Sequence, residues 1–256
     1  MKLKKLMCAV LAGVCVFSLA ACGNKESGSK DGEKKETLVM ATNAEFPPFE
    51  YYEGQEIVGI DAELAEEIGK ILGMEVKIED MAFDSVIPAV GTGKADFGAA
   101  GLTITEDRKT QVDFSDEYYT SKQKIIVKAD NAEIASPDDL KGKKIGVQQG
   151  TTGDIYSTDD FGDESVQRFN KGMEAVQALQ QGKVDAVIID EQPAKTFVEE
   201  NEGLKILETD YTEEAYAFCF KKDSDLVDKV NDALKQLKEN GKFDEIVSKY
   251  INSDAE

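Results

Sequence analysis

The stretch Gly93-Lys94-Ala95-Asp96-Phe97 carries the signal that decides the fold, because it marks a helix that ends at glycine and a strand that begins after aspartate. A series of alternating strands and helices surrounds it. The expected elements are strands at 38–41, 76–78 and 97–101 and helices at 61–72 and 85–90. This order predicts parallel strands with helices packed on the faces of the sheet.

A second copy of this signal, Gly182-Lys183-Val184-Asp185-Ala186, follows further along the chain. It lies between an expected helix at 173–181 and an expected strand at 186–189. Another strand is expected at 144–147, after a helix-start signal at Ser136-Pro137. Two similar α/β lobes are the simplest architecture for such a repeat. The alternative is chance recurrence of a common helix-to-strand turn.

Two β-prone segments, 117–128 and 215–220, are expected to cross between the lobes as a two-segment hinge. Amphipathic helices after them would complete the first lobe, on the apolar positions Leu226, Val230, Leu234, Leu237, Phe243, Ile246, Val247 and Tyr250. The expected division is 37–119 with 216–256 for lobe 1, and 120–215, which includes hinge segments, for lobe 2.

The N-terminus has the pattern of an export signal. A basic start precedes the apolar run 6–20, which is shorter than the ~20 residues of a membrane-spanning helix. The run ends Leu19-Ala20-Ala21-Cys22, and small residues directly before a cysteine resemble the lipobox of bacterial lipoproteins, in which that cysteine is acylated. We therefore expect a signal peptide over 1–21 and palmitate on Cys22, followed by a flexible polar tether to residue 36. The alternative is an ordinary signal peptide that contains this cysteine.

Composition excludes several classes of function. The formal net charge of −21 repels nucleic acid and anionic lipid, so we expect no nucleic acid partner and no membrane contact beyond the lipid anchor. The absence of histidine removes Ser-His and Cys-His nucleophiles and every histidine-containing metal site. Of the 4 cysteines only Cys219 would stay unmodified in the mature chain, where a buried core position is expected. No disulfide, metal or cofactor is expected.

Polar loops follow the expected strands, where the ligands of open α/β sheets gather. In the loop 101–108, Thr105 can cap a short helix whose first turn holds Arg108. A cation there is unfavourable for the helix dipole unless an anion lies beside it; the alternative is a solvated surface arginine. Asp190 ends an apolar strand, where a lone carboxylate is costly to desolvate unless an ammonium pairs with it. The alternative is the N-cap of a helix that starts at Glu191.

Two further loops could complete a site. The loop 148–154 places glycines and threonines before a helix, where backbone N–H groups and hydroxyls can bind a carboxylate; the alternative is a plain N-cap. In the loop 43–50 two prolines can hold Phe46 out as a flat wall, with Phe83 as the opposite wall. Facing aromatics suit an aliphatic, amide or cationic side chain. The alternative is that both phenylalanines are core residues.

Together these loops resemble the polar amino acid binding proteins of ABC importers, which form solute-binding protein family 3 and have the type II periplasmic binding protein fold. The resemblance implies an α/β fold of two Rossmann-like lobes joined by a two-segment hinge. It rests on ATNAEFPPFE (41–50), GID (59–61), GLTITEDR (101–108), VDFS (112–115), GTTG (150–153) and GKVDA (182–186).

Carried over residue by residue, the resemblance implies a site for one free amino acid. The residues expected to bind the ligand carboxylate are Arg108, Thr103, Gly101 and Thr152. Asp190 is expected to bind the ligand ammonium. The residues expected around the ligand side chain are Phe46, Phe83, Asn43, Glu45 and Gln148.

The pocket residues favour a basic ligand without fixing it. Asn43 stands where some binders of cationic side chains carry aspartate, although Glu45 could substitute. Gln148 stands where some glutamine binders carry lysine. Glu45, the aromatic walls and the acidity of the chain favour arginine or lysine, with glutamine or cystine as the next candidates.

The resemblance implies an extracytoplasmic, lipid-anchored monomer, not an enzyme, that delivers its amino acid to an ABC permease and ATPase. Two alternatives stay open. A cyclohexadienyl dehydratase-like enzyme on the same fold would need an acid–base group, for which Glu45 is the obvious candidate. An extracellular adhesin or sensor module would use the same pocket as a switch.

Overall fold

The computed structural model describes residues 36–251. The expected signal peptide (1–21), the acylation of Cys22 and the tether up to residue 35 lie outside the described residues. Among the residues that are described, no helix combines the length and the apolar character that crossing a membrane requires.

The first sheet has the strand order β5-β1-β6-β14-β7. Strand β1 runs parallel to β5 and β6, whereas β14 pairs antiparallel with β6 and β7. Its strands are β1 (Thr37–Thr42), β5 (Glu75–Asp80), β6 (Phe97–Gly98), β7 (Val112–Phe114) and β14 (Cys219–Lys221). Strand β14 therefore returns to this sheet more than 100 positions after β7, which makes the first lobe discontinuous in sequence.

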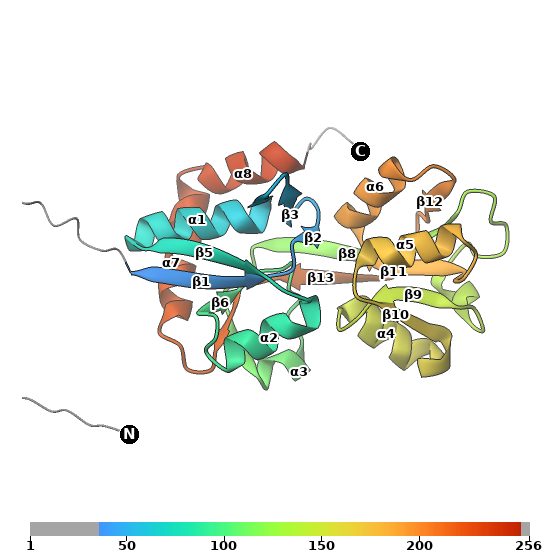
Figure 1. The fold of residues 1–256 in the computed structure, drawn as a ribbon, viewed down its shortest axis with the longest axis horizontal. Coiled ribbons are helices and arrows are strands. Elements are labelled where there is room, and N and C mark those ends of the chain that lie inside the picture. Colours follow the sequence, from blue (N-terminus) through green and yellow to red (C-terminus); the bar gives the residue numbers. More distant parts are fainter. Residues whose placement is uncertain (1–35, 252–256) are drawn as a thin grey trace, which may run out of the picture. The chain divides into compact units, whose positions relative to one another are not determined.

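Helices cover the two faces of the first sheet (Figure 1). Leu38 and Met40 of β1 face one apolar cluster and Ala41 faces another, as the alternation of side chains along a strand requires. Gly73, in a left-handed conformation, ends α1 as expected. The helices of this lobe are α1 (Ile60–Leu72), α2 (Phe83–Gly91), α3 (Glu106–Lys109), α7 (Leu226–Glu239) and α8 (Lys242–Tyr250).

The second sheet has the order β10-β9-β11-β8-β12, with β13 also paired to β8. Strand β9 is parallel to β10 and β11, and β8 is antiparallel to β11, β12 and β13. Its strands are β8 (Tyr119–Lys128), β9 (Ile145–Gln148), β10 (Val166–Phe169), β11 (Ala186–Asp190), β12 (Leu204–Ile206) and β13 (Thr212–Tyr216). Its helices are α4 (Thr152–Phe161), α5 (Gly172–Gln180), α6 (Glu191–Glu200) and the 3₁₀ turns η1 (Pro137–Leu140) and η2 (Asp163–Ser165).

Two strands connect the sheets. The chain leaves the first sheet after β7 and enters β8, and it returns through β13 into β14. Strands β8 and β13 pair antiparallel from Tyr119 opposite Tyr216 to Gln123 opposite Thr212. The expected lobe boundaries, at 119/120 and 215/216, fall within these two strands, which we propose act as the hinge.

The two-lobed α/β architecture is confirmed, whereas several elements differ from expectation. The strand expected at 97–101 pairs only at Phe97–Gly98, and the run 215–220 is divided between β13 and β14. The helix-start signal at Ser136 has its capping box with Asp139 but gives only the 3₁₀ turn η1, because Lys141 is already extended. A small sheet was not expected, since its strands are short and partly exposed: β2 (Glu45–Phe46), β3 (Glu50–Glu53) and β4 (Glu56–Val58).

Candidate functional site

A small cavity lies between residues of the two lobes. The first lobe lines it with Phe46, Phe83, Gly101, Thr103 and Arg108, and the second with Gln148, Thr151, Thr152 and Asp190. Most of these residues lie at the ends of strands, in the loops that follow them or in the first turn of the next helix, where ligands of α/β sheets bind. All the residues predicted for the site except Asn43 and Glu45 therefore line one cavity, and Thr151 lines it as well.

Arg108 is a buried cation, only 5% exposed, so the alternative of a solvated surface arginine is wrong. Helix α3 begins at the N-cap Thr105, whose Oγ1 accepts a hydrogen bond from the backbone N of Arg108 at 3.2 Å. The guanidinium donates to Thr103 O at 2.8 Å and, across the cleft, to Gly150 O at 3.1 Å. It also lies 5.5 Å from the ring centre of Phe83.

Asp190 is a buried anion at the end of β11, 6% exposed. It occupies the N-cap position of α6 but makes no capping hydrogen bond, so the N-cap alternative does not explain this carboxylate. Instead it accepts hydrogen bonds from the hydroxyls of Tyr216 and Ser121. Burial, and then the nearby Glu214, raise the pKa of Asp190 to about 7.

Neither Arg108 nor Asp190 forms a salt bridge with any residue in the described range 36–251. Burial lowers the pKa of Arg108, but a guanidinium stays protonated in proteins. Two buried groups of opposite charge thus line one cavity without an ionic partner. Buried charges are costly unless paired, so the site is suited to a ligand that carries both charges.

Glu214 is a buried carboxylate that the sequence reasoning missed. It lies on β13, is 6% exposed, and its Oε2 accepts hydrogen bonds from Thr103 Oγ1 at 2.8 Å, Thr152 Oγ1 at 2.9 Å and Gln123 Nε2 at 3.1 Å. Side chains alternate between the two faces of a strand, so the sequence could have shown that Glu214 lies on the same buried face as Tyr216, two residues further on.

The contacts of Glu214 change the roles expected for two threonines. A hydroxyl has one proton, and both Thr103 and Thr152 donate theirs to Glu214. Both threonines were expected to bind the ligand carboxylate, but neither hydroxyl has a proton left to donate into the cavity. Gly101 also differs, because its N–H donates to Asp61 Oδ2 at 3.0 Å. The backbone N–H of Gly101 is thus occupied within the protein.

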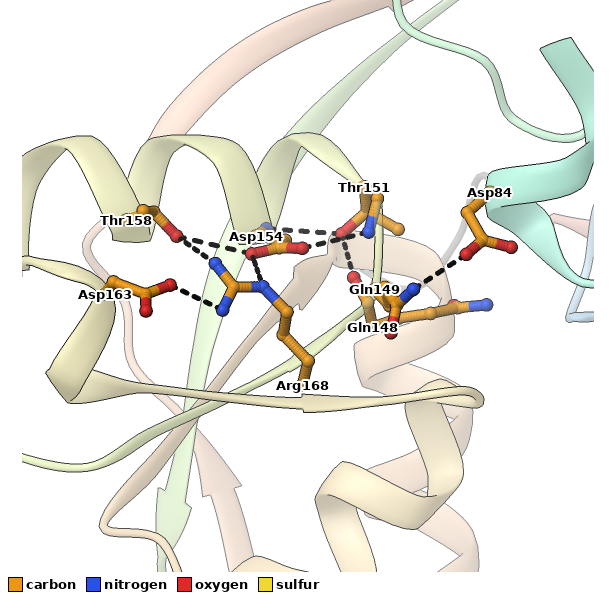
Figure 2. A network of polar contacts seen from close by, with 9 residues as sticks. Asp84, Gln148, Gln149, Thr151, Asp154, Thr158, Asp163 and Arg168 are labelled. Atoms are coloured by element: carbon orange, nitrogen blue, oxygen red, sulfur yellow. Dashed lines mark hydrogen bonds and ion pairs between the residues drawn. The ribbon is translucent and has the colours of Figure 1, made fainter. Parts of the chain in front are cut away.

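The start of α4 supplies the donors that those hydroxyls do not. Thr151 caps the helix, accepting from Asp154 N at 3.3 Å, and the first-turn N–H groups of Thr152 and Gly153 have no partner within the helix. Asp154 accepts from Gly150 N at 3.0 Å. It also accepts from Arg168 Nε at 2.8 Å, as Figure 2 shows. This network fixes the loop that presents the helix N-terminus to the cavity.

The aromatic walls are placed by close backbone packing. Gly101 has φ +54°, and a Cβ at this position would lie 2.7 Å from the Phe46 ring, so only glycine allows both the turn and the contact. Phe46 lines the cavity on one side and belongs to the apolar core on the other. The binding and core interpretations of Phe46 are therefore compatible.

Asn43 and Glu45 do not line the cavity. Asn43 accepts from Gln148 Nε2 at 2.8 Å and donates to Met81 O at 2.9 Å. Glu45 forms an ion pair with Lys171 of the second lobe. Both residues thus join the lobes, together with a bond from Gln149 Nε2 to Asp84 Oδ2 at 2.7 Å. A direct contact of Glu45 with a ligand cation is not supported by this arrangement.

Comparison with known proteins gives consistent results. The family described as bacterial extracellular solute-binding proteins, family 3, matches residues 38–253. The arginine-binding extracellular protein ArtP of Bacillus subtilis is 38% identical over 98% of this chain and 100% of its own length. An ancestral arginine-binding protein bound to arginine is 42% identical, with a TM-score of 0.80 over 85% of this chain and 99% of its own. The arginine-, lysine-, histidine-binding protein ArtJ of Geobacillus stearothermophilus is 35% identical, with a TM-score of 0.81 over 85% of this chain and 96% of its own.

Two α/β lobes with unpaired buried charges at their shared cavity define a two-lobed binding protein of the type II periplasmic class. The chain belongs to family 3 of the bacterial extracellular solute-binding proteins.

Proposed function

We propose that this protein is the binding subunit of an amino acid ABC importer and that it holds a free basic L-amino acid, with arginine as the first candidate. The observation that carries this function is the placement of Arg108 and Asp190, both buried and both without an ion pair in the described chain, at one cavity. A zwitterion satisfies both charges: its carboxylate binds Arg108 and the N–H groups that start α4, and its ammonium binds Asp190.

The charges around the cavity support a cationic ligand side chain. One cation, Arg108, stands near two carboxyl groups, Asp190 and Glu214. A zwitterion adds no net charge, whereas an arginine or lysine adds one positive charge to this acidic surrounding. The walls of Phe46 and Phe83 can stack on a guanidinium. Relatives named for arginine support the same choice, although one ancestral arginine-binding protein is also described bound to glutamine.

The two lobes share the ligand contacts, which gives a mechanism for capture. Arg108 belongs to the first lobe, and Asp190 and Thr152 belong to the second. A ligand that touches both lobes stabilises the closed state by its greater affinity for it. The permease would recognise that closed state, so delivery depends on whether a ligand is bound.

The cellular setting is part of the proposal. Acylation of Cys22 with palmitate would hold a monomer at the outer face of the cell membrane, and the polar residues after it would tether the lobes there. Partners would be the permease and ATPase of the importer. The pairing of Glu45 with Lys171 removes the obvious acid–base candidate of the enzyme alternative, which supports capture over turnover. Mass spectrometry of the mature N-terminus tests the anchor; an unmodified Cys22 would contradict it.

Calorimetric titration of the purified protein with arginine, lysine, glutamine and cystine tests the ligand. We expect arginine to bind most tightly. Arg108→Ala or Asp190→Ala should abolish measurable binding, because truncating one partner of a buried charge pair costs roughly 2–5 kcal/mol. Lys109→Ala, beside Arg108 but with its side chain 51% exposed, is the matched control and should bind normally. Near-normal affinity in either site variant, with a native circular dichroism spectrum, would overturn the assignment.

A further inference from the structure

Glu214 is where hydrogen bonds from both lobes and from the proposed hinge converge. Thr103 of the first lobe, Thr152 of the second lobe and Gln123 of β8 all donate to the same oxygen, Oε2. Glu214 itself lies on β13, the other strand that connects the sheets. Glu214 does not line the cavity itself, so any effect on a ligand passes through the lining residues Thr103 and Thr152 that it contacts.

The direction of the hydroxyl protons follows from these bonds. Because Thr103 and Thr152 direct their protons at Glu214, only their oxygen lone pairs remain for other partners. Thr152 Oγ1 already accepts from Gln123 Nε2 at 3.4 Å, which leaves it one lone pair, whereas the oxygen of Thr103 keeps both lone pairs to accept from the cavity. A cavity edge that accepts hydrogen bonds attracts an ammonium and repels a carboxylate.

Within residues 36–251, the carboxylate of Glu214 forms no ion pair. Its Oε1 is buried and makes no hydrogen bond of normal geometry among the described residues, although Glu214 is close enough to Tyr156 to raise the pKa of that hydroxyl after burial does. The field of Arg108 compensates part of this charge, since Glu214 is the leading charge that raises the pKa of that arginine against the effect of burial. An arrangement with this unsatisfied oxygen costs stability, which indicates that the charge serves the site.

We propose that Glu214 is a positioning residue: it fixes the hydroxyl protons of Thr103 and Thr152 away from the cavity and so selects ligands that carry an α-ammonium group. This inference rests on the proposed function. Glu214 touches no ligand and acts through the two threonines. It also couples the selection to closure, because the threonines come from opposite lobes and reach the same oxygen only when the lobes are together.

The variant Glu214→Gln tests this role with little change in shape. Its amide is neutral, so an amide oxygen in the place of Oε2 holds the two threonine protons less strongly than the carboxylate does, and an amide N–H in that place turns a threonine proton elsewhere. The two probes are L-arginine and δ-guanidinovalerate, which is arginine without its α-amino group. The measured quantity is the ratio of their dissociation constants. A purely structural role of Glu214 would weaken both probes together and leave the ratio unchanged.

We expect the wild type to prefer arginine strongly, and Glu214→Gln to lower that preference about tenfold or more. Glu213→Gln, an exposed neighbour on the same strand, should keep the wild-type ratio. If Glu214→Gln does not fold, Thr103→Val removes the accepting oxygen directly and should lower the ratio in the same direction. Wild-type ratios in a folded Glu214→Gln or Thr103→Val protein would overturn the inference. Failure of the wild type to bind arginine would overturn the proposed function instead, and this inference with it.

Discussion

Asp190 sets the protonation chemistry of the site. Its pKa of about 7 means that the ligand-free carboxyl group is partly protonated near neutral pH, as burial first and Glu214 second dictate. Only the ionised form can pair with an ammonium, so ligand binding lowers this pKa and releases a proton. Hydrogen bonds from the hydroxyls of Tyr216 and Ser121, and the side chain of Gln123, act in the opposite direction to burial and lower this pKa.

Affinity for arginine should therefore rise with pH. We expect about a tenfold gain per pH unit below pH 7 and little change above it, since one proton is released on binding. Calorimetry at about pH 5.5 and pH 7.5, in buffers of different ionisation enthalpy, measures both the affinity and the proton count. An affinity that is flat across this range, with no proton released, would show that Asp190 is fully ionised before the ligand arrives.

Glu50 and Asp61 form a second buried acidic pair behind the site. Both are 0% exposed, and Asp61 accepts from Gly101 N at 3.0 Å and Tyr118 Oη at 2.6 Å. Burial raises the pKa of Asp61 to about 6 and holds the pKa of Glu50 well above its ordinary value. Glu50 also faces the charge of Asp61, so Glu50 holds a proton more readily than an ordinary glutamate does, and an ionised Asp61 is suited to hold the Gly101 turn.

Glu50→Gln should consequently be tolerated. The amide mimics the protonated acid, and we expect the free energy of unfolding at pH 7 to change by no more than about 1 kcal/mol. A raised pKa favours the fold at low pH, and this contribution is lost as pH rises from the unfolded-state pKa through the folded-state pKa of Glu50. The wild type should therefore lose more stability than the variant as pH rises above the ordinary pKa of glutamate. Urea unfolding over this pH range measures the difference. Equal pH dependence of the two proteins would contradict a protonated Glu50.

At the scale of elements, the second lobe presents the N-terminus of α4 through a polar network. Arg168 on β10 donates to Asp154, Thr158 and Asp163, and Asp154 in turn holds Gly150 N (Figure 2). Gly150 O receives the cross-lobe bond from Arg108. The position of the anion-binding turn therefore depends on a strand that does not touch the cavity.

Arg168→Ala should weaken arginine binding without abolishing it. The side chain is 33% exposed, so solvent screens its ion pairs, and we expect a loss of roughly three- to tenfold in affinity. Gln167→Ala, an exposed neighbour on the same strand, should leave the affinity unchanged. Titration calorimetry distinguishes the two. A complete loss of binding in Arg168→Ala would assign the guanidinium to the ligand rather than to the turn.

At the scale of the whole molecule, bonds between the lobes surround the cavity on several sides. Lys171 pairs with Glu45, Gln149 donates to Asp84, and Arg108 donates to Gly150. These contacts are few and partly exposed, so they favour closure only weakly without a ligand. The ligand supplies the remaining free energy by joining Arg108 to Asp190.

Arginine should raise the thermal midpoint by mass action. At about 100 times the dissociation constant the native state gains about 2.7 kcal/mol, which corresponds to roughly 5–10 °C for a chain of this size. A thermal-shift series with arginine, lysine and glutamine measures the effect, and the shift should disappear in Arg108→Ala. Shifts of equal size for all three ligands would contradict a preference for a basic side chain.

The sequence by itself determined many local features of this protein: the main helices and strands of both lobes, and the position of Arg108, Asp190, Phe46 and Phe83 at or near the ends of these elements. Hydrophobic period, glycine stops and caps act over a few residues, so they can be read along the chain. Only the tertiary structure decided which of these groups meet. Glu214 reaches Thr103 from 111 positions away, and Glu45 turns from the cavity to Lys171 across 126 positions, because strand register and lobe packing join segments whose local sequences carry no sign of one another.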